Sequence, residues 1–194
     1  GSRKEKTEEF KKRFHVGEKN AKFIMYAPTF REQKTDGVRS VHLQEWSLDF
    51  EKLITTLQHK FGGSWYVCIR VHPQLADSVQ GYRGKRLIDL SREDDMYEVL
   101  AAMDMLITDY SSVAMDAGFA GIPVFIYADD IEEYVKDRGS LLWELSADST
   151  VGVKNNKRMT PGINTELPFG IAQNNDELVD IIFQFDREDY ESKI

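Results

Sequence analysis

The sequence has 194 residues, the size of one ordinary domain or of one domain with an appendage. Hydrophobic residues make up 41% of it, which supplies a sizeable core and excludes a largely disordered chain. The 33 acidic and 25 basic residues give a net charge of −8, which argues against broad nucleic-acid binding because such binding needs a basic face.

The cysteine count and the two ends of the chain set further bounds. Cys68 is the single cysteine, so an internal disulfide framework and a cysteine-based structural zinc site are excluded. No apolar run reaches the roughly 20 residues that a membrane-spanning helix needs. Gly1 and Ser2, without a leading Met, indicate a tag-cleavage remnant, so we expect an excised fragment. Residues 1–20 are then that remnant and a charged linker or surface helix, and residues 21–194 form the main domain.

From residue 22 onward, short apolar runs alternate with longer amphipathic ones. The runs predict strands, and the segments with apolar residues at helical spacing predict helices. In chain order we expect a strand at Phe23–Tyr26, a helix at Asp49–Phe61, a strand at Trp65–Val71, a weaker strand at Arg86–Leu90, a helix at Asp94–Met103, a strand at Met105–Thr108, a helix at Ser111–Ala120, a strand at Val124–Tyr127 and a helix at Asp176–Phe185. Residues 146–169 lack periodicity and predict a long loop.

This alternation predicts the fold class. Strands that alternate with helices form βαβ units around a mostly parallel sheet, which gives a three-layer α/β, Rossmann-like domain. The strands read as apolar runs, as expected when helices cover both faces of the sheet. In such sheets ligands bind at the carboxyl ends of the strands, so the residues that follow each strand are the candidates for function.

The first two strand ends offer cationic and hydrogen-bonding side chains. After the first strand come Thr29 and Arg31, and the guanidinium of Arg31 can bind a phosphate with two hydrogen bonds. The second strand ends at Arg70 and His72, which share a face if the strand continues through them. Pro73 restricts His72 to extended geometry, and its imidazole can bind a phosphate or act as an acid. A surface arginine in a turn and a structural histidine are the simpler interpretations.

The third strand end carries the sharpest motif, Thr108-Asp109-Tyr110-Ser111-Ser112. It joins a buried strand to a helix rich in small residues, so Ser111 and Ser112 can cap that helix where its first N–H groups favour an anion. Asp116 lies one helical turn further on and is a candidate acceptor for ribose hydroxyls. A plain serine cap and a solvent-facing aspartate remain open alternatives.

Two acidic pairs invite a metal interpretation that we consider weaker. Asp94-Asp95 and Asp129-Asp130 each precede a predicted helix, where carboxylates favour the positive end of the helix dipole. We therefore expect capping at both pairs and no metal site.

The ordered set of motifs resembles the CDP-glycerol glycerophosphotransferase family, the teichoic-acid primases and polymerases. The matching stretches are Ala27–Arg31, Arg70–Pro73, Met103–Val113 and Pro123–Asp130, followed by Tyr134 and Arg138-Gly139. The resemblance covers roughly residues 22–140, and each motif is short but the ordered set is specific. It implies one half of a GT-B architecture, the carboxy-terminal donor-binding domain, with the amino-terminal acceptor domain outside this chain.

The resemblance also implies a reaction. An acceptor hydroxyl attacks the β-phosphorus of CDP-glycerol and CMP leaves, with His72 as the catalytic residue that stabilises or protonates the leaving phosphate. The implied substrate-binding residues are Thr29, Arg31, Arg70, Thr108, Asp109, Ser111, Ser112 and Asp116. The base that activates the acceptor is expected on the other domain, so this chain alone should turn over poorly. No metal or other cofactor is expected to bind tightly, and Mg²⁺ carried by the donor stays open.

The implied partners are the CDP-glycerol donor, a polyol-phosphate or glycan acceptor and the protein's own amino-terminal domain, with no nucleic acid. The implied location is cytoplasmic, peripheral on the inner face of the plasma membrane. Three alternatives remain: a CDP-ribitol donor, a nucleotide-sugar glycosyltransferase or epimerase of the same architecture, and a non-catalytic binding module. The residues at Leu167–Gly170 match the family's Pro-Gly-Pro-like stretch only partly, which leaves the donor head group open.

Overall fold

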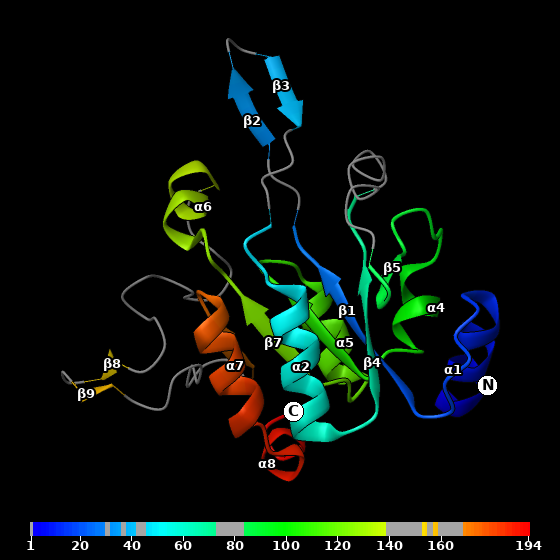
Figure 1. Ribbon diagram of the computed structural model, residues 1–194. Helices are drawn as coiled ribbons and strands as arrows, with labels where there is room; N and C mark the ends of the chain where they lie inside the picture. The colour runs from blue at the N-terminus through cyan, green and yellow to red at the C-terminus, as the bar shows by residue number, and fades with distance from the viewer. Residues whose placement is uncertain are drawn as a thin grey trace.

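The computed structural model describes residues 2–29, 32–35, 38–41, 46–72, 84–138, 153–154, 157–158 and 169–194. Its centre is a six-stranded parallel sheet (Figure 1). From edge to edge the strands are β10 (Gly170–Ala172), β7 (Val124–Tyr127), β6 (Met105–Thr108), β1 (Ala21–Ala27), β4 (Ser64–Ile69) and β5 (Leu87–Asp89). All five neighbouring pairs run parallel, which confirms the predicted fold class.

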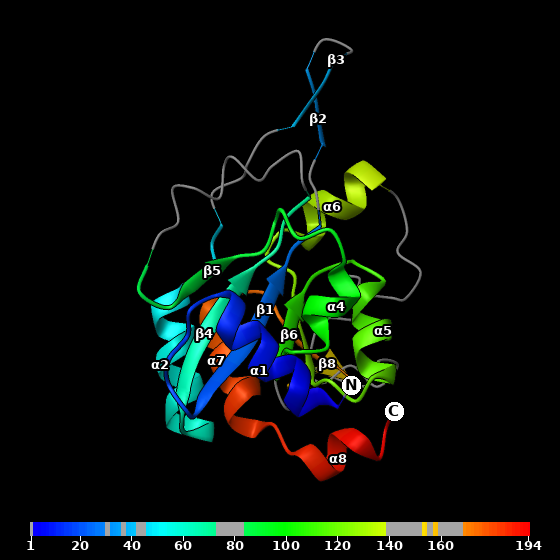
Figure 2. The ribbon, with the colours of Figure 1, turned by 90° about the vertical axis from the view of Figure 1, so that its right-hand side faces the viewer.

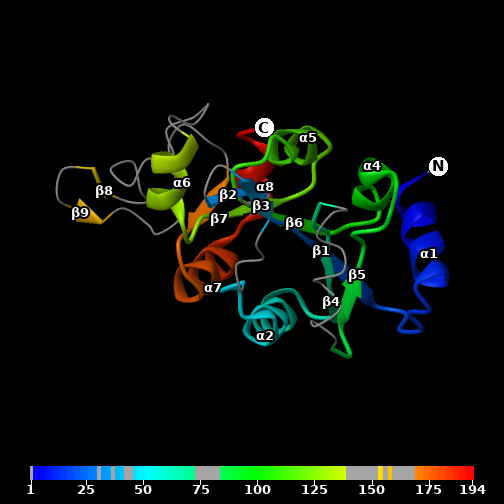
Figure 3. The ribbon, with the colours of Figure 1, turned by 90° about the horizontal axis from the view of Figure 1, so that it is seen from above.

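Helices cover both faces of the sheet (Figure 3). One face packs against α1 (Arg3–Arg13), α4 (Met96–Leu100), α5 (Val113–Phe119) and α8 (Arg187–Glu191). The other face packs against α2 (Phe50–Phe61) and α7 (Asn175–Gln184). β6 and β7 lie between these layers and are buried at every residue, which explains why their sequences are continuous apolar runs. Within the described segments, no helix is both long enough and apolar enough to span a membrane.

The main differences from the predicted elements occur at chain ends and in short pieces. α1 is a helix, as one of the two interpretations of residues 3–20 expected, but its Phe10 is buried against Phe23 of β1. The helix expected over Asp94–Met103 is only the five residues of α4, because the amides of Ala102 and Met103 bond the carbonyls three residues back and the chain leaves the helix there. β10 and α8 were not predicted.

Two small antiparallel pairs lie outside the main sheet. β2 (Glu32–Thr35) and β3 (Val38–Val41) form a hairpin between β1 and α2 that stands clear of the sheet beyond the carboxyl end of β1 (Figures 1 and 2). α6 (Ile131–Arg138) follows β7 at the same end. β8 (Val153–Lys154) and β9 (Lys157–Arg158) pair within residues 146–169, the segment predicted as a long loop. Apart from these two strands and Phe169, that segment lies outside the described residues.

Candidate functional site

The strand order has a switch point at the carboxyl ends of β1 and β6. When the six strands are numbered in chain order, the row β5-β4-β1-β6-β7-β10 reads 3-2-1-4-5-6. The chain first adds strands on one side of β1 and then adds the others on its opposite side, beginning with β6. The connection after β1 leads to α2 on one face, whereas β6 leads to α5 on the other. The two connections therefore diverge at one point, which is where ligands bind in open α/β sheets.

At this point Thr29 and Asp109 are joined by several hydrogen bonds. The backbone N–H of Thr29 donates to both carboxylate oxygens of Asp109, with N···O distances of 2.8 and 2.9 Å, and the Thr29 hydroxyl donates to Oδ1. The Tyr110 N–H donates to the same Oδ1 at 2.7 Å. Asp109 is only 3% exposed, so the carboxylate is buried at this switch point.

The neighbouring Thr108 also joins the two strands. Its side chain is fully buried, and its hydroxyl donates to the Ala27 carbonyl at 2.7 Å. The sequence placed Thr108 among the substrate-binding residues. In the structure its hydroxyl has a partner within the sheet, and its visible role is to hold β6 against β1.

The turn into α5 positions Ser111, Ser112 and Asp116. Ser111 Oγ accepts a hydrogen bond from the Val113 N–H at 3.3 Å, whereas the exposed Ser112 precedes the helix without a side-chain cap bond. The exposed Asp116 carboxylate accepts from the Tyr97 hydroxyl of α4 at 3.0 Å. This bond is the largest of the effects that raise the pKa of Tyr97, a residue that the sequence did not single out.

The end of β4 positions Arg70 and His72. β4 ends at Ile69, so the strand alternation that predicted a shared face does not extend to these residues. Arg70 Nη2 donates to the Glu93 carbonyl at 3.0 Å, and its buried Nε has no hydrogen-bond partner among the described residues. Burial lowers the pKa of Arg70, and the carboxylates of Asp95 and Glu93 partly oppose this. His72 is exposed at the carboxyl edge.

The two acidic pairs, Asp94-Asp95 and Asp129-Asp130, accept hydrogen bonds from different kinds of donor. Asp95 is the N-cap of α4, because its carboxylate accepts from the N–H groups of Tyr97 and Glu98, which confirms the capping interpretation for that pair. Asp129 accepts from the Ser47 hydroxyl. Asp130 accepts from the Tyr110 hydroxyl at 2.9 Å.

Tyr110 therefore connects the end of β6 to α6. Its ring stacks on Tyr134 with centroids 3.9 Å apart, in addition to the bond from its hydroxyl to Asp130. Sequence reasoning did not give Tyr110 or Ser47 a role. The position of Tyr110 within the strand-end motif could have indicated a role for it. Nothing in the sequence around Ser47 indicated one. Arg31 lies outside the described residues, as does Pro73.

Comparison with known proteins decides the family. A family model described as CDP-glycerol:poly(glycerophosphate) glycerophosphotransferase matches residues 1–147. The chain belongs to this family. Its relatives include a teichoic acid ribitol-phosphate primase of Bacillus spizizenii, 33% identical over 123 residues that cover 62% of this chain and 29% of the relative. A teichoic acid poly(glycerol phosphate) polymerase of Staphylococcus epidermidis is 35% identical over 117 residues, which cover 59% of this chain and 15% of the relative.

Solved structures agree with this membership. The wall teichoic acid polymerase TagF matches 98% of this chain with a TM-score of 0.65 and 27% identity, and the match covers 41% of the TagF chain. A TagF variant soaked with CDPG matches with a TM-score of 0.62 and 26% identity. The chain thus spans less than a third of the length of these two curated relatives and less than half of TagF. The family is one of teichoic acid phosphotransferases that act with glycerol phosphate or ribitol phosphate.

Proposed function

We propose that this chain is the donor-binding domain of a polyol-phosphate transferase that uses CDP-glycerol. The observation that carries the proposal is the switch point in strand order between β1 and β6, in a chain of this family. The residues that follow these two strands, Thr29 and Asp109, are hydrogen-bonded to one another there. Ser112, in the turn after β6, and His72, three residues after β4, are exposed.

In the proposed reaction, the oxygen of an acceptor hydroxyl attacks the β-phosphorus of CDP-glycerol. The bond from that phosphorus to the oxygen bridging to CMP breaks, CMP leaves, and the acceptor proton passes to a base of the amino-terminal domain. Such transfers depend on positioning and on charge stabilisation. Arg31 and the turn at Ser111 and Ser112 hold the pyrophosphate, and His72 stabilises or protonates the departing phosphate. Asp116 accepts from the ribose hydroxyls.

CDP-ribitol is a second candidate donor, and a specific observation favours keeping it. The relatives include ribitol-phosphate and glycerol-phosphate enzymes at similar identity, 33% for a ribitol-phosphate primase and 30% for a glycerol-phosphate primase of the same species. Overall likeness therefore does not distinguish the two donors. The two head groups differ in length and in the number of hydroxyls, so the pocket around the polyol decides between them.

Calorimetric titration with CDP-glycerol, CDP-ribitol, CMP and UDP tests the proposal, with and without Mg²⁺. We expect CDP-glycerol and CMP to bind and UDP to bind at least about tenfold more weakly, a difference of 1.4 kcal/mol in binding free energy. If CDP-ribitol binds more tightly than CDP-glycerol, CDP-ribitol is the donor. Preference for UDP would favour a nucleotide-sugar enzyme, and no binding of any nucleotide would favour a non-catalytic module. Transfer to a glycerol-phosphate polymer, measured with the full-length protein, then tests the reaction.

A further inference from the structure

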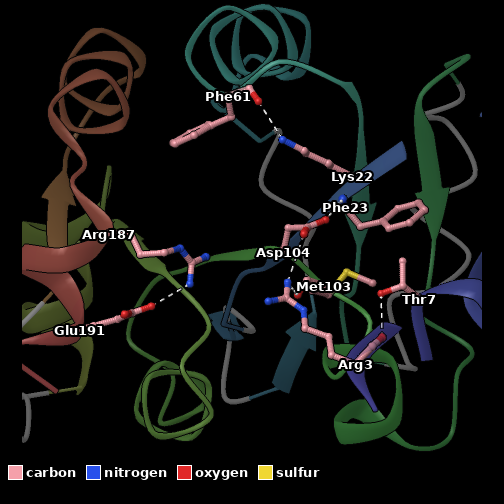
Figure 4. Close-up of polar contacts among 9 residues, drawn as sticks. All are labelled: Arg3, Thr7, Lys22, Phe23, Phe61, Met103, Asp104, Arg187 and Glu191. Carbon is pink, nitrogen blue, oxygen red and sulfur yellow. Dashed lines mark hydrogen bonds and ion pairs between the residues drawn. The ribbon is translucent and has the colours of Figure 1, made fainter. Parts of the chain in front are cut away.

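Two aspartates bracket β6, and each accepts a hydrogen bond from a backbone amide, one within β1 and one just after it. Asp104 precedes β6, and its Oδ2 accepts from the Phe23 N–H at 2.8 Å at the amino edge, where Arg3 also contacts it (Figure 4). Asp109 follows β6 and accepts from the Thr29 N–H at the carboxyl edge. The same kind of carboxylate-to-amide bond thus links the residues flanking β6 to the chain at β1 twice, once beside the proposed site and once at the opposite end of the strands.

The Asp109 carboxylate has little capacity left for a ligand. Its Oδ1 accepts from the Thr29 N–H, the Thr29 hydroxyl and the Tyr110 N–H, and its Oδ2 accepts from the Thr29 N–H. The residue is 3% exposed. A pyrophosphate is also an anion, so a buried carboxylate would repel it. These facts argue against the direct donor contact that the sequence assigned to Asp109.

We propose that Asp109 is a positioning residue that acts on the donor through Thr29. Its carboxylate fixes the backbone amide and the hydroxyl of Thr29 at the point where the chain leaves β1. The same carboxylate accepts from the Tyr110 N–H in the turn that leads to α5. Asp109 therefore holds the turn after β1 against the turn after β6, and these two turns flank the proposed site. This inference rests on the proposed function, because it concerns the binding of the CDP-glycerol pyrophosphate.

The matched aspartates allow a controlled test on the 194-residue chain. Asp104→Ala removes a carboxylate that bonds a backbone amide within β1, and Asp109→Ala removes one that bonds a backbone amide two residues after β1, so both should lower the melting temperature. We expect Asp109→Ala to raise the Kd for CDP-glycerol about tenfold, because hydrogen bonds to a charged group are among the stronger ones. Asp104→Ala should leave that Kd within about twofold, and Asp109→Asn, which keeps one acceptor, should recover part of the loss.

A double-mutant cycle with Thr29→Val separates action through Thr29 from direct contact. Thr29→Val removes the hydroxyl bond, and it should weaken CDP-glycerol binding in the wild-type background but add little in the Asp109→Ala background. If Asp109→Ala does not fold, Asp109→Asn takes its place in the cycle. If the fold-increases in Kd of the two single variants multiply in the double variant, Asp109 contacts the donor itself. If the Asp104 and Asp109 variants raise the Kd equally, the cause is a general loss of stability. Either result overturns the positioning role.

The wild-type titration keeps this inference distinct from the proposed function. If the wild-type chain binds neither CDP-glycerol nor CMP, the proposed function is wrong and the positioning role falls with it. If it binds them and the Asp109 variants bind equally well, only the positioning role is wrong.

Discussion

His72 is an exposed side chain at the carboxyl edge, so its removal should change chemistry more than stability. We expect His72→Ala to lower transfer by the full-length enzyme at least about 100-fold, the contribution typical of an acid or base in a transition state. The melting temperature should stay nearly unchanged. Transfer rates and thermal unfolding measured on the same preparation test this.

His59 provides the control for that variant. It lies in the last turn of α2, where its ring contacts Phe183 with centroids 5.6 Å apart, and α2 leads into the amino-terminal end of β4, opposite the carboxyl edge. His59→Ala should keep normal transfer. If His72→Ala retains activity per folded molecule and melts earlier, His72 is a structural residue and leaves the proposed site.

Asp104 should give the free energy of unfolding a pH dependence. Burial raises its pKa, although the Phe23 N–H and the charges of Arg3, Lys22 and Arg187 act in the opposite direction (Figure 4). The folded protein therefore keeps the proton to a higher pH than the unfolded chain. The stability that Asp104 contributes is fully present below its ordinary pKa near 4 and is lost as the pH rises through the raised value.

Asp104→Asn should remove this dependence. Relative to the wild type, the variant should gain stability as the pH rises above about 4, because it carries no buried charge to desolvate. Urea unfolding at several pH values between about 4 and 7 measures the difference. A difference that does not change with pH would contradict the raised pKa.

At the scale of single residues, the sequence predicted which residues lie at strand ends better than it predicted their hydrogen-bond partners. His72, Ser111 and Ser112 could be placed at strand ends because the end of a strand is a local property. Local sequence does not predict the hydrogen bond from Tyr97 to Asp116, which joins α4 to α5 and whose partners are 19 positions apart. Nor does it predict the hydrogen bond from Thr29 to Asp109, whose partners are 80 positions apart. Such pairs depend on strand order, which only the folded sheet defines.

At the scale of elements, α1 should behave as part of the domain core. Phe10 is 5% exposed, and its ring lies 4.8 Å from that of Phe23 and 4.5 Å from that of Phe14. We expect Phe10→Ala to lower the free energy of unfolding by about 3–5 kcal/mol, as truncation of a buried phenylalanine usually does. The exposed neighbour Glu9 is the control, and Glu9→Ala should change stability by no more than about 0.5 kcal/mol. Similar small effects for both, in denaturant titrations, would show that α1 is only a surface appendage.

The elements that the sequence predicted well are the buried ones. β6 and β7 have the predicted bounds, because each is a short apolar run that helices cover on both faces. α2 and α7 were found through their amphipathic spacing. β10 has three residues and α8 has five, so neither contains enough periods to be recognised. The charged segment that contains β2 and β3 has no apolar alternation, and its pairing could not be read from composition.

At the scale of the whole molecule, ligand binding should affect one edge of the sheet only. If CMP binds at the switch point between β1 and β6, hydrogen exchange should slow in peptides covering residues 27–29 and 108–113, at the carboxyl edge. Peptides covering residues 21–23 and 103–105, at the amino edge, should exchange as before. At a CMP concentration of 100 times Kd the chain should also gain about 2.7 kcal/mol of stability. Slowed exchange at the amino edge alone would place the ligand elsewhere.

The β2–β3 hairpin leaves and rejoins the domain at two anchored points. Thr29 is bonded to Asp109 where the chain departs. Where it returns, the Ser47 hydroxyl hydrogen-bonds the Tyr127 hydroxyl at 2.9 Å and the Ser47 carbonyl accepts from Asn175 at 2.8 Å. Insertions are tolerated best where the flanking backbone is held independently of them. Both ends of the segment are therefore held to the domain independently of the hairpin, so we expect the hairpin to tolerate a change of length without disturbing the sheet.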